Sequence, residues 1–144
     1  MTPIDILLVE DNPADRELAL RSLNQYGLSN NIIVCKDGDQ ALAAILRRGE
    51  FRERSPLGLV LLDLHLPTFS GFDVLGLIRA NPETSKVPVI VLTSSDDAPD
   101  IDEARKLGAD HYMVKPIDFA KVVQVAKVLG FRWALLPSIE DCNT

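Results

Sequence analysis

The sequence predicts an α/β fold in which helices cover both faces of a parallel five-stranded sheet. Strand-like and helix-like segments alternate five times along the 144 residues, which is the pattern of consecutive strand–helix units. The first strand-like run, residues 5–9, is apolar at nearly every position instead of every second one, as in a strand buried on both faces. A 47% share of hydrophobic residues supplies one core, and a chain of this length is typical of one domain.

Five short runs rich in valine, isoleucine and leucine are the predicted strands. They cover residues 5–9, 31–35, 59–62, 87–92 and 111–114. A segment with apolar residues at helical spacing follows each run. Asn12 and Pro13 mark a helix N-cap and its first residue, while Gly27 and Gly49 mark helix ends. The helices are expected from 13 to 27, from 37 or 39 to 49, over 72–80 and 100–107, and from 118 onward, with a polar loop over 50–56.

Reactive side chains follow four of these strands. They are Glu10 and Asp11 after the first, Asp63 after the third, Thr93 and Ser94 after the fourth, and Lys115 after the fifth. The carboxyl ends of parallel strands lie along one edge of a sheet, where ligands bind. A strand order of 2-1-3-4-5 would make the first and third strands neighbours and bring the three acids together. The sequence therefore predicts a combined metal and phosphoryl site at this edge.

Asp63 is the predicted nucleophile, because a carboxylate can accept a phosphoryl group and form an acyl phosphate. Glu10 and Asp11 would repel Asp63 unless a cation lay between them, and Mg²⁺ (or Mn²⁺) prefers such oxygen ligands. We expect Asp11 and Asp63 to be direct ligands, Glu10 to act through water, and the carbonyl of His65 to add another oxygen. The alternatives are that Asp63 bonds its own turn and that Asp11 only favours the start of the first helix.

Lys115 and Thr93 complete the predicted site. The ammonium of Lys115 can pair with phosphate or, before phosphorylation, with Asp63. The hydroxyl of Thr93 can donate to a phosphoryl oxygen, with Ser94 beside it. The alternatives are a solvated lysine and an ordinary β-branched strand residue.

The charge and the cysteines exclude several classes of protein. A net charge of −6 argues against nucleic acid and against an anionic membrane surface. The longest apolar runs are too short to span a bilayer, and residues 1–5 lack the features of a signal peptide. Cys35 and Cys142 fit neither a metal spacing nor a disulfide framework, so we expect a cytoplasmic protein with reduced thiols.

The chain resembles the receiver domains of bacterial two-component response regulators. The matching residues are Glu10-Asp11, Asp63 with Pro67 and Gly71, Thr93, and Lys115-Pro116. The resemblance covers about residues 4–129 and implies the flavodoxin-like, doubly wound (βα)5 fold with strand order 2-1-3-4-5 and a cis Lys115–Pro116 bond. It also implies Mg²⁺-dependent phosphorylation of Asp63 by the phosphohistidine of a sensor histidine kinase. Such a protein is a signalling phosphoacceptor that catalyses only its own phosphorylation and dephosphorylation.

The resemblance further implies a switch and two positions that tune it. Thr93 moves toward the phosphoryl group, Tyr112 turns inward behind it, and the face formed by the fourth and fifth strands and helices changes. His65 and Ser95 occupy positions that influence how water reaches the acyl phosphate in this family. The alternatives are a half-buried Tyr112 with one rotamer and a surface imidazole at His65.

A receiver domain over residues 1–129 leaves residues 130–144 as a C-terminal extension, which has room for no second domain. Large apolar residues gather in it before Pro137, namely Phe131, Trp133, Leu135 and Leu136. Such residues suggest an interface, and folding back over the parent core is the alternative. This ending is similar to stand-alone regulators of cyanobacterial and bacterial phytochromes, which implies a homodimer and a phytochrome-type kinase as partner.

Three other functions fit the sequence less well. A pseudo-receiver that only binds partners would not need the acids and Lys115. A phosphohydrolase of the haloacid dehalogenase type needs a second aspartate where this chain has His65. A flavin binder of the flavodoxin type needs a phosphate loop after the first strand, where Glu10 and Asp11 would repel phosphate.

Overall fold

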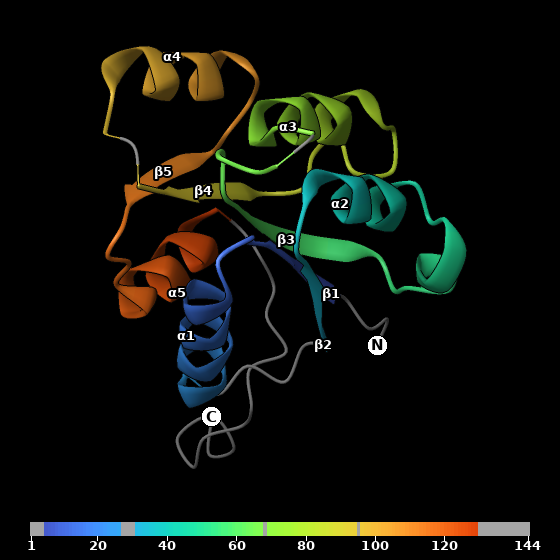
Figure 1. Ribbon diagram of the computed structural model, residues 1–144, viewed down its shortest axis with the longest axis horizontal. Coiled ribbons are helices and arrows are strands. Elements are labelled where there is room, and N and C mark those ends of the chain that lie inside the picture. The colour runs from blue at the N-terminus through green and yellow to red at the C-terminus, as the bar shows by residue number, and fades with distance from the viewer. Residues whose placement is uncertain (1–4, 27–30, 68, 95, 130–144) are drawn as a thin grey trace.

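Five parallel strands form one central sheet in the computed structural model, which describes residues 5–26, 31–67, 69–94 and 96–129 (Figure 1). The strands are β1 (Asp5–Val9), β2 (Asn31–Cys35), β3 (Leu57–Leu62), β4 (Val89–Thr93) and β5 (His111–Val114). Their order is β2-β1-β3-β4-β5, which confirms the expected topology. Because β1 and β3 are neighbours in register from Ile6 opposite Leu59 to Val9 opposite Leu62, the residues that follow them emerge side by side.

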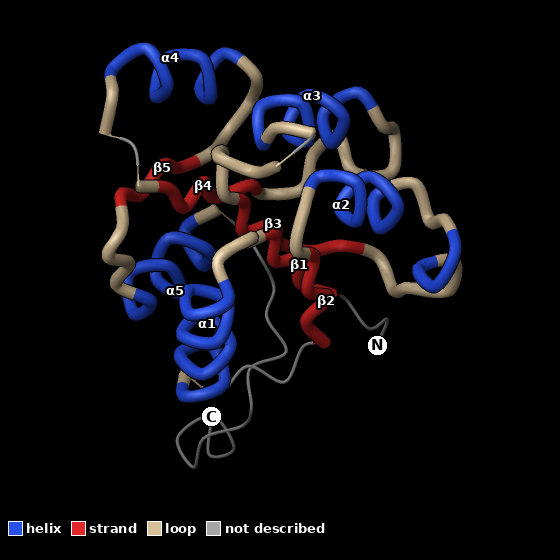
Figure 2. The backbone as a smooth tube through the Cα atoms, viewed as in Figure 1, coloured by secondary structure: helices blue, strands red, loops and turns tan. Residues whose placement is uncertain are grey.

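Helices flank this sheet on both faces (Figure 2). They are α1 (Pro13–Gln25), α2 (Gly38–Ile45), α3 (Gly71–Ala80), α4 (Ala98–Lys106) and α5 (Phe119–Val128), with a short 3₁₀ helix, η1 (Gly49–Phe51). Side-chain oxygens cap the amino ends of four of them. The capping residues are Asn12, Asp37, Ser70 and Asp118. Among the described residues, no helix has the length and apolarity needed to cross a bilayer.

Successive residues of each central strand enter two different cores, as the continuous apolar runs predicted. Leu7 and Val9 of β1 pack into the core beneath α2, α3 and α4, whereas Ile6 and Leu8 pack into the core beneath α1 and α5. Figure 1 shows the same division, with α2, α3 and α4 on one side of the sheet and α1 and α5 on the other. The sheet is thereby fixed from both faces, and its carboxyl edge holds the site.

Helix α2 ends at Ile45, not at Gly49 as expected. Arg47 adopts a left-handed φ of 57°. The N–H of Arg48 donates to the carbonyl of Ala43 at 2.8 Å, and the N–H of Arg47 donates to that of Ala44 at 3.4 Å. This is the Schellman pattern of helix termination, in which glycine usually takes the left-handed position. An arginine takes it here, so the sequence signal pointed to the next glycine and missed η1.

Two strands also begin elsewhere than expected. β3 begins at Leu57 because this residue is buried and pairs with Asp5 of β1. β4 begins at Val89, because the N–H of Val87 is bound in a turn to the carbonyl of Thr84 at 3.0 Å and Pro88 has no N–H to donate.

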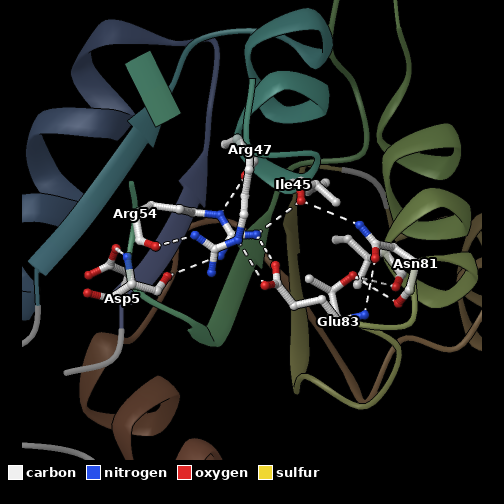
Figure 3. A network of polar contacts seen from close by, with 10 residues as sticks. Asp5, Ile45, Arg47, Arg54, Asn81 and Glu83 are labelled. Carbon is white, nitrogen blue, oxygen red and sulfur yellow. Dashed lines mark hydrogen bonds and ion pairs between the residues drawn. The ribbon is translucent and has the colours of Figure 1, made fainter. Parts of the chain in front are cut away.

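Arg54 joins three elements at the amino edge of the sheet (Figure 3). Its side chain is only 2% exposed. The guanidinium donates to the last carbonyls of α2, those of Ala44 at 2.6 Å and Ile45 at 3.0 Å, and to Glu83 at 2.6 Å. Arg47 binds the second carboxylate oxygen of Glu83 at 2.9 Å. The buried guanidinium therefore ties the end of α2 to the segment that precedes β4.

Replacing Arg54 by methionine keeps the length of the side chain but leaves these buried carbonyls without a donor. We expect Arg54→Met to lower the free energy of unfolding by about 2–4 kcal/mol, measured by urea denaturation. Arg52→Met, at an exposed position two residues away, is the control and is expected to change stability by less than about 0.5 kcal/mol. Equal losses in the two variants would contradict a specific role for Arg54.

Candidate functional site

Three carboxylates converge at the carboxyl edge of the sheet. Glu10 and Asp11 follow β1, and Asp63 follows β3. Sheet-like hydrogen bonds continue past the strand ends: the N–H of Glu10 donates to Cys35 at 3.0 Å and that of Asp63 donates to Val9 at 3.0 Å. One carboxylate oxygen from each acid lies within 4.8 Å of the others. This spacing and this donor set suit a small divalent cation that prefers oxygen ligands.

The three acids differ in their exposure to solvent. Glu10 is 4% exposed and Asp63 is 5% exposed, whereas Asp11 is exposed. A cation held here would thus have two buried carboxylates behind it and an open side toward water, which fits an ion that retains several water ligands.

Lys115 binds two of these acids, Glu10 and Asp63, and the contact with Asp63 was predicted from the sequence. Its Nζ lies 2.6 Å from Oε1 of Glu10, 2.8 Å from Oδ2 of Asp15 and 3.1 Å from Oδ2 of Asp63. The ammonium has three N–H donors, and each has a carboxylate acceptor. The bond between Lys115 and Pro116 is cis, which confirms that expectation.

The electrostatics of the cluster reflect its excess of negative charge. Burial raises the pKa of Glu10 to about 7, and although the hydrogen bond from Lys115 opposes this, the charge of Asp63 adds to it. For Lys115, burial lowers the pKa, but the bonds to Asp15 and Glu10 and the charge of Asp63 outweigh it and raise the pKa above its ordinary value. The lysine thus stays charged, while the acids still lack a full counter-charge.

Short-range contacts fix the backbone that carries these acids. The guanidinium of Arg16 donates to the carbonyls of Glu10 at 3.1 Å and Asp11 at 2.8 Å. The N–H of Asn12 donates to Oε2 of Glu10 at 3.2 Å. The N–H of His65 donates to Oδ1 of Asp63 at 2.9 Å. These contacts fix the positions of Glu10, Asp11 and Asp63 relative to one another.

Gly71 allows the start of α3 to lie against the loop that carries Asp63. A side chain on Gly71 would collide with the backbone of Asp63 and Leu64, and the N–H of Gly71 donates to the carbonyl of Leu64 at 2.9 Å. This close approach explains physically why a glycine follows the predicted nucleophile at this distance.

Thr93 is fully buried at the end of β4, and its carbonyl accepts the N–H of Lys115 at 2.7 Å. Ser94 follows at an exposed position. Tyr112 is partly buried and packs against the core beneath α2, α3 and α4. β4 and β5 pair with Thr93 opposite Val114 and Val91 opposite Tyr112, so Thr93 and Tyr112 lie on adjacent strands.

His65 lies at the open side of the site. Its side chain is 53% exposed, and Nε2 is 3.7 Å from Oδ2 of Asp100 in the first turn of α4. Ser95, the other position expected to tune phosphate lifetime, lies outside the described residues. So do the apolar residues of the C-terminal extension, namely Phe131, Trp133, Leu135 and Leu136.

Three features of the site were not assigned to it from the sequence. Asp15 has the sequence pattern of an ordinary acid in the first turn of a helix, yet it binds a lysine 100 residues away. Nothing in the sequence indicated that Arg16 contacts the site, because arginine is common on exposed helix faces. A small apolar notch beside Lys115 was also missed, and it brings together α1, the β5–α5 loop and the start of α5. Its walls include Leu18, Ala19, Pro116, Ile117 and Phe119.

Comparison with known proteins shows which chains share this arrangement. The family of response regulator receiver domains matches residues 6–127. The response regulator Rcp1 of Synechocystis sp. is 34% identical over 139 residues, which are 94% of this chain and 95% of Rcp1. The structure of the Mn²⁺-bound form of Rcp1 is similar with a TM-score of 0.76 and 31% identity, covering 94% of this chain and 100% of that one.

Two phytochrome response regulators of known structure are also similar. The bacteriophytochrome response regulator AtBRR has a TM-score of 0.83 and 36% identity, covering 96% of this chain and 100% of its own. The phosphorylated cyanobacterial phytochrome response regulator RcpA has a TM-score of 0.77 and 33% identity, covering 94% of this chain and 99% of its own.

Cation binding at the three acids is expected to depend on pH through Glu10. A cation competes with the proton that burial favours, so Mg²⁺ affinity should rise with pH up to the pKa of about 7 and level off above it. Isothermal titration calorimetry in buffers of different ionisation enthalpy should show proton release near pH 6.5, roughly half a proton or more. Glu10→Gln should remove both effects, whereas Glu103→Gln on the exposed face of α4 should retain them. Affinity independent of pH in the unmodified protein would contradict the assignment.

Proposed function

Since the chain belongs to the family of response regulator receiver domains, we propose that it is a signalling phosphoacceptor. In this proposal Asp63 accepts a phosphoryl group from the phosphohistidine of a sensor histidine kinase, and the protein does not turn over a separate substrate. The observation that carries the proposal is the buried carboxylate of Asp63, 3.1 Å from the ammonium of Lys115 and grouped with Glu10 and Asp11.

In the transfer, a carboxylate oxygen of Asp63 attacks the phosphorus atom of the donor. The new P–O bond forms as the P–N bond of the phosphohistidine breaks, and the electron pair of that bond stays on the imidazole nitrogen, which then takes a proton. Phosphoryl transfer depends more on alignment of the reacting atoms and on charge stabilisation than on covalent chemistry by the protein. The His65 N–H holds one oxygen of Asp63 at 2.9 Å and so fixes the carboxylate for attack.

Mg²⁺ is the ion we propose for the site, held by Asp11 and Asp63 with Glu10 close by. The three convergent carboxylates fit it by donor type and spacing, and the Mn²⁺-bound form of the similar protein Rcp1 supports a divalent ion of this kind. When bound, the cation supplies positive charge next to the transferring phosphoryl group.

Lys115 and Thr93 then stabilise the product. The ammonium, which binds Asp63 before transfer, can donate to a phosphoryl oxygen after it, and the hydroxyl of Thr93 can turn toward the same group. His65, on the open side of the site, is proposed to modulate how water reaches the acyl phosphate.

The proposed output is a change in the face formed by α4, β5 and α5. Movement of Thr93 toward the phosphoryl group would open space for Tyr112, which already packs against the core. Tyr112 also lines a groove of about 330 Å³ between α4 and β5, together with Ile101, Arg105 and Val114. A two-state side chain at this place would convert a local change of charge into a change of surface.

The similarity to the phytochrome response regulators AtBRR and RcpA supports a phytochrome-type kinase as the donor. We further propose a homodimer in which Phe131, Trp133, Leu135 and Leu136 contribute to the interface. Val128, near the end of α5, is 81% exposed, so the apolar character of the extension begins on the described part of the chain.

Incubation with Mg²⁺ and acetyl phosphate is expected to add the mass of one phosphoryl group to the intact protein. Asp63→Asn should remove the adduct, because an amide is not nucleophilic enough to replace the carboxylate. Asp102→Asn, at an exposed position of α4, should retain it. An adduct that persists in Asp63→Asn would contradict the assignment, and rapid repeated hydrolysis of phosphoesters would indicate a hydrolase.

Replacing Phe131 and Trp133 by serine in the full chain is expected to convert a dimer into a monomer, as measured by light scattering. The loss of two large apolar side chains removes the contact area that anchors an interface. Leu18→Ser removes another half-exposed apolar side chain and is expected to leave the mass unchanged. An unchanged mass for the double variant would rule out the role of the extension.

A further inference from the structure

Lys115 has three carboxylate partners, and Asp15 differs from the other two. Glu10 and Asp63 belong to the group of acids whose oxygens converge within 4.8 Å, and among the described residues Asp15 is not part of that group. A bound cation would therefore draw on the charge of Glu10 and Asp63 but not on that of Asp15. Asp15 is the partner that the lysine would keep.

Local contacts fix Asp15 so that it faces Lys115. It lies in the first turn of α1, where its N–H donates to Oδ1 of the N-cap Asn12 at 3.0 Å. Asn12 in turn donates its own N–H to Glu10 at 3.2 Å. The carboxylate of Asp15 then binds Nζ of Lys115 at 2.8 Å, closer than Asp63 does at 3.1 Å.

We propose that Asp15 is a positioning residue that restrains Lys115 and thereby slows phosphoryl transfer to Asp63. This inference rests on the proposed function. It assigns to α1 an influence on the speed of the reaction, through a residue outside the group of acids proposed to hold the cation.

The restraint on Lys115 follows from the contacts of its three N–H donors. All three N–H groups face carboxylates, so a phosphoryl oxygen must displace one of them. Release of Glu10 or Asp63 is compensated by the cation, whereas Asp15 continues to hold one donor.

The negative charge of Asp15 should also slow phosphoryl transfer. Three carboxylates bind one ammonium, and the exposed carboxylate of Asp11 lies beside two of them, so an anionic donor approaches an acidic site. Removal of the charge of Asp15 weakens this repulsion. Before a cation or a phosphoryl group binds, Lys115 would keep its place in Asp15→Asn, because Glu10 binds it at 2.6 Å and Asp63 at 3.1 Å.

The test compares the phosphorylation rates of the full chain, Asp15→Asn, Asp15→Glu and Glu53→Gln with acetyl phosphate at saturating Mg²⁺ and low salt. We expect the second-order rate constant to rise about three- to ten-fold in Asp15→Asn, with a smaller gain at high salt. Asp15→Glu restores a carboxylate and should return the rate toward that of the unmodified protein. Glu53→Gln removes the same charge at an exposed position before β3, at the opposite edge of the sheet, and should change nothing.

A second measurement does not depend on phosphoryl transfer. Beryllium trifluoride mimics a phosphoryl group, and its Mg²⁺-dependent binding can be followed by ¹⁹F NMR. We expect Asp15→Asn to bind it about three-fold or more tightly than the unmodified protein does. An unchanged unfolding midpoint in Asp15→Asn would exclude a merely structural effect.

The outcomes separate the two proposals. Equal or slower phosphorylation in Asp15→Asn, together with unchanged or weaker binding of beryllium trifluoride, overturns the role of Asp15 while the proposed function stands. No adduct in any variant or in the unmodified protein overturns the proposed function, and with it the role of Asp15 in phosphoryl transfer. If neither the unmodified protein nor Asp15→Asn binds beryllium trifluoride, the proposed restraint of Lys115 by Asp15 is overturned as well.

Discussion

The contact between Lys115 and the acids of the sheet edge is the interaction on which the rest of the site depends. Glu10 and Asp63 are almost completely buried, and two buried carboxylates at this spacing would repel each other strongly without a positive partner. The ammonium of Lys115, which follows β5, reaches the acids that follow β1 and β3 and the acid in the first turn of α1. A single lysine therefore fixes the relative positions of three strand ends and a helix.

This arrangement leaves the site short of positive charge. One ammonium cannot neutralise four carboxylates. Burial raises the pKa of Glu10 to about 7, and the charge of Asp63 adds to this effect. In the proposed function, a divalent cation and a phosphoryl group would change this balance in opposite directions: the cation would relieve the surplus of negative charge, and the phosphoryl group would add to it. The site thus has the property that a switch requires, which is a charge distribution that differs clearly between its two chemical states.

Much of this could be predicted from the sequence, because the information is local to the strand ends. Glu10, Asp11, Asp63 and Lys115 each follow a short apolar run, and parallel topology brings such positions to one edge whatever the details of packing. What the sequence does not specify is the partner of a charged side chain far along the chain. Asp15 has the pattern of an ordinary first-turn acid, and only the folded chain brings it next to Lys115.

The other errors have a similar physical origin. Arg54 stands in a polar stretch that favours a loop, yet its guanidinium is buried because the carbonyls at the end of α2 and Glu83 together satisfy its donors. Helix α2 ends with an arginine in the left-handed position, where sequence rules look for glycine. In both cases a tertiary contact overrides the local conformational preference of the sequence, and the spacing of apolar residues does not reveal that contact.

Anomalous diffraction from crystals soaked in Mn²⁺ would test the central claim most directly. We predict one strong peak within coordination distance of Asp11 and Asp63, next to Glu10, with Lys115 still on the other side of the acids. A cation bound elsewhere, or no cation at the acids with Lys115 still spanning Glu10, Asp15 and Asp63, would show that the lysine alone balances the site and would contradict the account.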